Sequence, residues 1–150
     1  MPEAVRLLAS FLLAVGVSAV PIASAAVPLA PAVVRAAGSC TGWPSDSVPP
    51  TTIRVLRTAG PANGTVQVVP FQAYVNVVMA AEWGPNDPIE ALKAGAVAVK
   101  QYAWHWTDVY RGGTGPDGSC YDVVDSTVDQ EYSPETRVPS PSELAAVQAT

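Results

Sequence analysis

Residues 68–110 decide the fold, and their sequence is VVPFQAYVNVVMAAEWGPNDPIEALKAGAVAVKQYAWHWTDVY. This stretch predicts two consecutive helices, with one carboxylate, Glu82, at the joint between them. The first helix is expected to start at Pro70, because proline is tolerated at a first helical position. Apolar residues then recur at helical spacing and predict one buried face. That face consists of Phe71, Tyr74, Val75, Val78 and Met79.

Glu82 is predicted to lie on this same apolar face. It follows Phe71 by 11 residues, and at about 100° per residue it returns to within about 20° of the direction of Phe71. Burial and the negative end of a helix dipole both raise the pKa of a carboxyl group. The position therefore predicts a general acid that works near neutral pH. The alternative is a solvated glutamate at a helix end with apolar neighbours.

The second helix has start and stop signals of its own. Residues 83–85 (WGP) end the first helix, and residues 87–90 (DPIE) combine an N-cap, a first-turn proline and a capping-box glutamate. The body is rich in alanine, and Gly95 costs about 1 kcal/mol relative to alanine, so close packing is the expected reason for it. The helix is expected to run to about Tyr110, roughly 33 Å, and to end at residues 112–113.

The flanking segments predict an α+β fold in which a short β-hairpin feeds the two helices. The Asn-Gly pair at residues 63–64 favours a tight turn between the two hairpin strands. A short strand and a polar loop follow the second helix, and a third helix begins near Ser142. The chain reaches Thr150 without a helix stop signal, so an incomplete domain is expected. The predicted segments are strands 51–57, 65–69 and 120–125, and loop 126–132.

The N-terminal residues predict an exported protein. An apolar run follows Arg6, and residues 23–25 (ASA) match a small-x-small cleavage site, so residues 1–25 are interpreted as a signal peptide. The alternative is an uncleaved anchor. No other transmembrane segment is expected. A flexible Pro/Ala/Ser-rich lead-in over residues 26–52 precedes the domain at 53–150, and the expected location is secreted or cell-wall-associated.

Charge and cysteine content exclude some partners and predict a covalent link. The net charge is −5, and residues 117–135 hold six acidic residues and no Lys or Arg. Nucleic acid and an anionic membrane surface are therefore unlikely partners on charge grounds. The two cysteines, Cys40 and Cys120, predict one disulfide in an oxidising compartment. Two unpaired thiols are the alternative. Two Cys and one His are too few for a convincing zinc site, and no metal or cofactor is predicted.

Two sequence blocks resemble the core of the SpoIID/LytB domain. The first runs from Val69 to Ala103 and contains a glutamate-tryptophan pair followed by PIEALKAGAVAVKQYA. The second, DSTVDQEY, occupies residues 125–132. Each block by itself is a weak signal, and the combination is specific. The resemblance covers about residues 66–150.

The resemblance implies a cell-wall protein. Members of the sporulation branch cleave peptidoglycan glycan strands as lytic transglycosylases. Members of the other branch enhance a wall amidase without cleaving glycan. The catalytic glutamate of the family maps onto Glu82. The loop near the glycan groove maps onto Asp125, Thr127, Gln130 and Tyr132. Where some members carry His/Cys metal ligands, this chain has Val128 and Asp129, so no metal is carried over.

The chemistry of the residues agrees with a lytic transglycosylase. One carboxyl group can act first as acid and then as base when the 6-hydroxyl of the muramyl sugar closes a 1,6-anhydro ring, so paired carboxylates are not compulsory. Asp125 is the candidate second carboxylate if water is the attacking group. Trp83, next to Glu82, is the candidate for stacking on a sugar. Lys100 either meets the anionic wall polymer or is solvated. An exported disulfide-linked domain with no wall role is a third interpretation.

Overall fold

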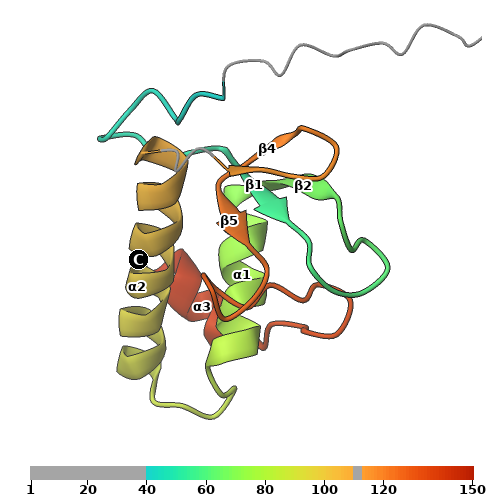
Figure 1. The fold of residues 1–150 in the computed structure, drawn as a ribbon. Coiled ribbons are helices and arrows are strands. Elements are labelled where there is room, and N and C mark those ends of the chain that lie inside the picture. The colour runs from blue at the N-terminus through green and yellow to red at the C-terminus, as the bar shows by residue number, and fades with distance from the viewer. Residues whose placement is uncertain (1–39, 110–112) are drawn as a thin grey trace, which may run out of the picture. The chain divides into compact units, whose positions relative to one another are not determined.

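The structure is a computed structural model that describes residues 40–109 and 113–150. Figure 1 shows an α+β fold in which a small sheet packs against helices, as predicted. The signal peptide, most of the lead-in and Tyr110 lie outside the described residues. The elements are β1 (Thr52–Leu56), β2 (Val66–Pro70), α1 (Phe71–Glu82), α2 (Ile89–Val109), β3 (Gly113–Thr114), β4 (Cys120–Tyr121), β5 (Val123–Val124) and α3 (Pro141–Gln148).

The predicted hairpin is confirmed, but its connection is wider than a two-residue turn. Strands β1 and β2 pair in antiparallel register, with Ile53 opposite Val69. Beyond the strands, the N–H of Arg57 donates to the carbonyl of Thr65, at 2.9 Å. Gly64 has a φ of 81°, in the left-handed region that glycine adopts without strain. The residues from 57 to 65 therefore form a loop of several turns, and the expected tight Asn-Gly turn is wrong.

The strand predicted at residues 120–125 is divided into two short strands. Strand β4 pairs antiparallel with β3, and β5 pairs parallel with β1, so that the larger sheet has the order β2-β1-β5. Asp122 lies between β4 and β5. Its N–H donates to the carbonyl of Arg54 at 2.8 Å, while its carboxylate accepts bonds from the backbone and guanidinium of Arg54. This side-chain ion pair interrupts the strand and fixes it to β1.

The hydrophobic core lies between the sheet and the three helices. The predicted apolar face of α1 is buried at all five positions. It packs with α2 residues such as Leu92 and Val99, and with Ala146 of α3. Ser140 caps α3 in a capping box with Glu143, so the helix starts at Pro141, one residue before the serine expected from the sequence. Helix α3 contacts both α1 and α2.

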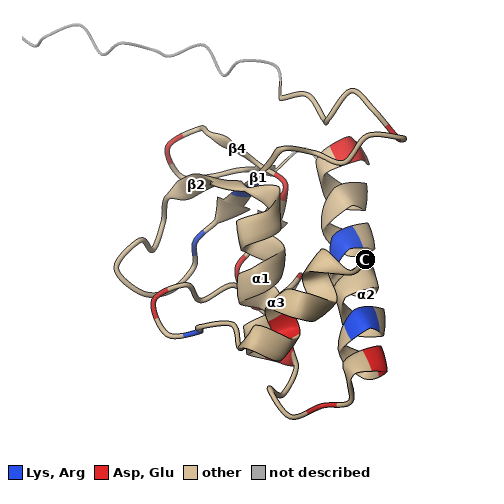
Figure 2. Ribbon diagram, turned by 180° about the vertical axis from the view of Figure 1, so that it is seen from behind, with Lys and Arg blue, Asp and Glu red and all other residues tan. Residues whose placement is uncertain are grey.

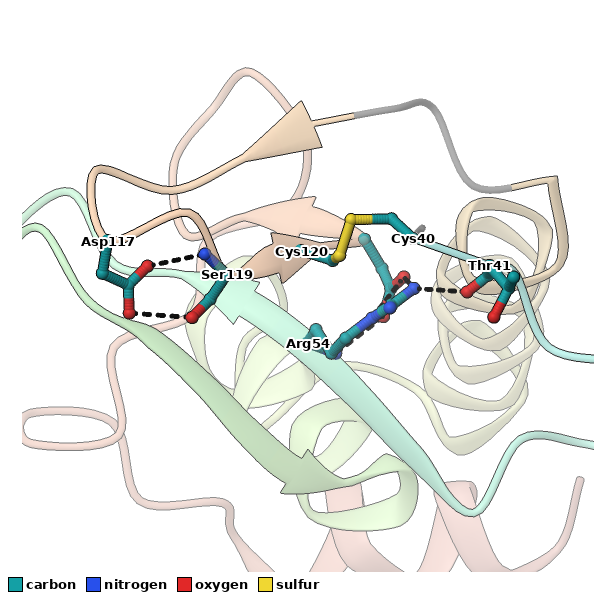
Figure 3. The surroundings of a disulfide bond; sticks show 7 residues. Cys40, Thr41, Arg54, Asp117, Ser119 and Cys120 are labelled. Carbon is teal, nitrogen blue, oxygen red and sulfur yellow. Dashed lines mark hydrogen bonds and ion pairs between the residues drawn. A yellow bond between two sulfur atoms is a disulfide. The ribbon is translucent and has the colours of Figure 1, made fainter. Parts of the chain in front are cut away.

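The Cys40–Cys120 disulfide is present, as predicted, with a Cα–Cα distance of 5.7 Å. It joins the segment before β1 to β4, beside the side chain of Arg54 (Figure 3). The N–H of Trp43 donates to the carbonyl of Thr107 at 2.7 Å, which holds the same segment against the C-terminal part of α2. The disulfide therefore secures the segment that precedes the sheet.

Close packing explains the glycine inside α2, as predicted. Gly95 is buried, and a Cβ atom built on it would lie 2.7 Å from Nε1 of Trp83. The indole of Trp83 therefore rests on the bare backbone of α2. Figure 2 shows acidic positions near both ends of α2 and two basic positions between them. Among residues 40–109 and 113–150, no helix combines the length and the apolar character needed to cross a membrane.

Candidate functional site

Glu82 is brought to the DSTVDQEY block by the end of helix α1. Its Oε1 atom accepts a hydrogen bond from the backbone N–H of Glu131 at 3.0 Å. The two sequence blocks therefore meet at this carboxylate, through residues 49 positions apart in the chain. The side chain is exposed to solvent, so the predicted burial of Glu82 is wrong. In the free protein, burial therefore does not prepare this carboxyl for acid catalysis.

The exposure of Glu82 has a simple geometric cause. The helical period gave its direction correctly, because residues on that side of α1, such as Val78, are fully buried. Glu82 is the last residue of the helix, however, and the buried residues of α1 end at Met79. The backbone N–H of Glu131, in the polar loop, donates to Glu82. The period of a helix determines which way a residue points, whereas burial also requires neighbours at that level.

Two residues of the block, Gln130 and Tyr132, face the core. Gln130 is 6% exposed, and its Oε1 accepts a hydrogen bond from the hydroxyl of Tyr74 at 3.2 Å. The rings of Tyr74 and Tyr132 stack with centroids 5.2 Å apart. Burial, with smaller contributions from the carboxylates of Asp129 and Glu82, raises the pKa of Tyr74 well above its usual value. These contacts fix the backbone on both sides of Glu131, whose N–H donates to Glu82.

Asp129 holds the loop from the other side, a role that sequence reasoning missed. Its Oδ1 accepts from the hydroxyl of Tyr102 at 2.7 Å, and its Oδ2 accepts from the N–H of Val124 at 2.6 Å. A carboxylate that closes a turn in this way has a structural function. Among the described residues, no group of three or more His, Cys, Asp and Glu side chains is arranged to hold a metal ion.

Asp125 is buried and takes part in an ion pair. Its Oδ2 lies 2.7 Å from Nε of Arg57, and both side chains are 2% exposed. Its Oδ1 accepts from the N–H and the hydroxyl of Thr58. The guanidinium of Arg57 also donates to Gln67 and to Glu135, both at 2.8 Å. Asp125 therefore holds the second block to the segment that follows β1, and its contact with a glycan stays a prediction.

The sequence did contain a signal for this ion pair. Two arginines, one in β1 and one directly after it, and two aspartates next to β5 share a spacing of three residues, and each Arg-Asp pair is separated by 68 residues in the chain. The same offset relates Val55 to Val123 in the parallel register. Matched charge spacing between two segments predicts such a register. The two pairs are Arg54–Asp122 and Arg57–Asp125.

The remaining predicted contact residues lie in three different environments. Trp83 is half-buried against Gly95, beside Glu82. Thr127 is exposed in the loop of the second block. The ammonium of Lys100 donates to the carbonyl of Val147 at 2.7 Å, at the end of α3, and burial lowers the pKa of this lysine. Lys100 thus fastens α3 to α2, whereas Trp83 and Thr127 belong to the two blocks that meet at Glu82.

Of the two candidate carboxylates, Glu82 is the one exposed to solvent. Glu82 is exposed and held by a backbone donor, while Asp125 has both oxygens engaged within the protein. A carboxyl group that transfers protons has to touch its substrate. The geometry therefore fits chemistry that needs a single acid-base group, and it does not fit a reaction that uses Asp125 as a partner of Glu82.

Comparison with known proteins agrees with the sequence blocks. None of the curated proteins compared with the chain matches it. Residues 60–150 match the model of the SpoIID family, described as stage II sporulation protein, and this range contains Glu82 and both blocks. The chain therefore belongs to the SpoIID family, and this membership indicates a function related to the cell wall.

Proposed function

We propose that this protein is exported, binds peptidoglycan glycan strands and cleaves them as a lytic transglycosylase, with Glu82 as its acid and base. The observation that carries the proposal is the position of Glu82. It is the solvent-open carboxylate at the place where the two family blocks meet, and the N–H of Glu131 orients it. The buried contacts of Tyr74 with Gln130 and Tyr132 fix that N–H in turn.

The proposed reaction uses one carboxyl group twice. Neutral Glu82 donates its proton to the glycosidic oxygen while the bond from that oxygen to C1 of the muramyl sugar breaks. The resulting carboxylate then takes the proton of the 6-hydroxyl of the same sugar, whose oxygen bonds to C1 and closes a 1,6-anhydro ring. The proton returns to Glu82 and no water is consumed. In this proposal the bound strand covers Glu82 and excludes water from it.

The environment of Asp125 supports a reaction without a second carboxylate. Hydrolysis of a glycosidic bond ordinarily uses two carboxyl groups that flank the bond. Asp125 is 7% exposed and is held by Arg57 and Thr58. Turning it toward a glycan would leave the charge of Arg57 buried without this partner, which is costly. Ring closure by the 6-hydroxyl requires no such rearrangement.

The decisive experiment compares the wild type with Glu82→Gln on purified, peptide-free glycan strands. Both proteins are expressed with any residues that the gene encodes after Thr150. The substitution keeps the shape of the side chain and removes its proton transfer, so turnover should fall about 100- to 10,000-fold while glycan binding stays within a few-fold. The matched control is Asp46→Asn, which removes an exposed carboxylate outside both blocks and should leave turnover unchanged.

The products distinguish the mechanisms. A lytic transglycosylase releases ends that carry 1,6-anhydro-muramyl sugars, which are lighter by one water than reducing ends and are separable by mass spectrometry. Reducing ends would overturn the proposal and indicate hydrolysis with a second group. Export has its own test. Protein recovered from outside the cell is expected to begin after Ala25, as N-terminal mass analysis would show.

The alternative function, enhancement of an N-acetylmuramoyl-L-alanine amidase without cleavage, has one observation in its favour. The second block turns Asp125, Gln130 and Tyr132 inward and leaves Thr127 and Val128 exposed, the latter at 72%. An exposed loop tip of this kind suits contact with a protein partner as well as with a sugar. Intact glycan binding without cleavage, together with a faster amidase in the presence of the chain, would favour this function.

A further inference from the structure

A small cavity next to Arg57 combines a buried positive charge with an exposed acidic partner. The cavity has a volume of about 250 Å³, and its walls come from the hairpin loop and the segment after the second block. It is lined by Arg57, Ala59, Gly60, Pro61, Asp125, Ser133, Glu135 and Thr136. Its size suits the end group of a ligand, because pockets for whole small molecules usually start near 300 Å³.

The two carboxylates that pair with Arg57 differ in how firmly they are held. Asp125 is 2% exposed at its side chain and accepts hydrogen bonds from Arg57 and Thr58. Glu135 is 36% exposed at its side chain and accepts from Nη2 of Arg57 at 2.8 Å. The Arg57–Glu135 pair is open to solvent on its glutamate side, and an ion pair that solvent reaches is weaker than one closed on both sides. Glu135 can therefore leave Arg57 while Asp125 and Gln67 keep the guanidinium in place.

We infer that this cavity is a carboxylate-binding site, in which a ligand carboxylate replaces that of Glu135 on Arg57. The exchange leaves the charge next to the guanidinium unchanged, since one carboxylate takes the position of another. The planar guanidinium is suited to this group, and Ser133 and Thr136 line the same cavity. A protein of net charge −5 repels carboxylates in general, so such binding needs a local arginine.

The ligand class is a small monocarboxylate, and cell-wall material offers two sources of it. One is the lactyl group of N-acetylmuramic acid, and the other is the free end of a peptide. The site does not involve Glu82, so its existence is independent of glycan cleavage. Glu82→Gln protein should bind carboxylates as the wild type does, and failure of one proposal would leave the other standing.

The test is an NMR titration of the purified, isotope-labelled protein with four probes. Acetate, N-acetylmuramic acid and N-acetyl-D-alanine carry the carboxylate. N-acetylglucosamine is the matched control, because it lacks the lactyl group of N-acetylmuramic acid. Binding should shift the Nε–H signal of Arg57 and the amide signals of Gly60 and of residues 133–136 with the carboxylates and not with N-acetylglucosamine. The tighter of the two larger probes identifies the source of the ligand.

The sharpest variant is Glu135→Gln, because Glu135 is exposed and its replacement should leave the fold intact. Removing the competing carboxylate should tighten acetate binding about 2- to 10-fold, since the ligand no longer has to displace Glu135 from Arg57. Asp46→Asn changes the net charge equally, away from the cavity, and should leave the affinity unchanged. Equal affinities for wild type and Glu135→Gln, or equal shifts with N-acetylglucosamine, would overturn the inference. Substituting Arg57 itself is less informative, because its loss leaves Asp125 buried without its ion-pair partner.

Discussion

Glu82 and Asp125 come from the two sequence blocks that lie within the range matching the family, yet the fold gives these carboxylates opposite environments. Glu82 lies at the open end of α1 and accepts a backbone hydrogen bond from Glu131. Asp125 is buried directly after β5, with both oxygens bonded to Arg57 and Thr58. A reactive group must be within reach of a substrate, whereas a structural charge must be satisfied inside the protein. The comparison distinguishes Glu82, which a substrate can reach, from Asp125, which stabilises the fold.

The largest effect on stability is expected from a substitution at Asp125, the buried one of these two carboxylates. Asp125→Asn removes the charge that pairs with buried Arg57 and should lower the free energy of unfolding by about 3–5 kcal/mol. Glu82→Gln should change it by less than about 0.5 kcal/mol, as surface substitutions usually do. Urea denaturation measures both values. Similar losses of unfolding free energy for the two variants would show that Glu82 also stabilises the fold.

The disulfide offers a second test of the difference between stability and reactivity, because it secures the sheet side of the molecule and does not touch Glu82. Replacing both Cys40 and Cys120 by serine should lower the free energy of unfolding by about 2–4 kcal/mol, since the link joins residues 80 apart in the chain. Glycan turnover per folded molecule should not change. Denaturation curves with and without a reducing agent test the first expectation. A loss of turnover at full folding would mean that the N-terminal segment contributes to the site.

A smaller effect is expected at the contact between Trp83 and α2, which lies beside Glu82. Gly95→Ala places a Cβ against the indole, at a cost of about 1–3 kcal/mol. Better helix propensity offsets about 1 kcal/mol of that, so a net loss of about 1 kcal/mol is expected. In a Trp83→Leu background the same substitution should become neutral or stabilising, and a double-mutant cycle measures this coupling. Independent effects would contradict the assigned contact.

Much of the fold could be predicted from local signals in the sequence. The spacing of apolar residues gave the buried face of α1, and caps gave the ends of the helices to within a few residues. The parallel pairing of β5 with β1 was missed, because β5 has two residues and its register depends on a partner 68 positions away. The wide hairpin loop was missed for a related reason. Its shape depends on bonds of Arg57 to Gly64 and Thr65 that the Asn-Gly pattern does not reveal.

The resemblance associated Glu82 with the second block, and it did not predict which side chains of the two are buried. The family pattern identified Glu82 and the loop around Gln130, and the structure joins them through Glu131. A pattern of residue types contains no information on which side of the backbone each side chain takes. Gln130 and Tyr132 turn inward because Tyr74 offers a hydroxyl and a ring to pack against. Such partners become visible only when the helix and the loop are placed together.

The smallest expected effect concerns the second carboxylate on Arg57, and it depends on pH. The hydrogen bond from Arg57 holds the pKa of Glu135 below its usual value of 4.5. Because the folded pKa is the lower one, the contribution of Glu135 to stability is complete above about pH 4.5 and is lost as the pH falls through the folded value. Glu135→Gln lacks this contribution at every pH.

The difference in melting temperature between wild type and Glu135→Gln should therefore stay constant from about pH 7 to about pH 5 and shrink below about pH 4.5. Thermal unfolding followed by circular dichroism measures it, with Asp46→Asn as the charge control. A difference in melting temperature that persists below about pH 4.5 would mean that Glu135 does not stabilise the fold through its charge. A gap that closes while the protein remains folded would show that Arg57 can lose its exposed partner and keep its buried one, Asp125, which is the property that the exchange of Glu135 for a ligand carboxylate requires.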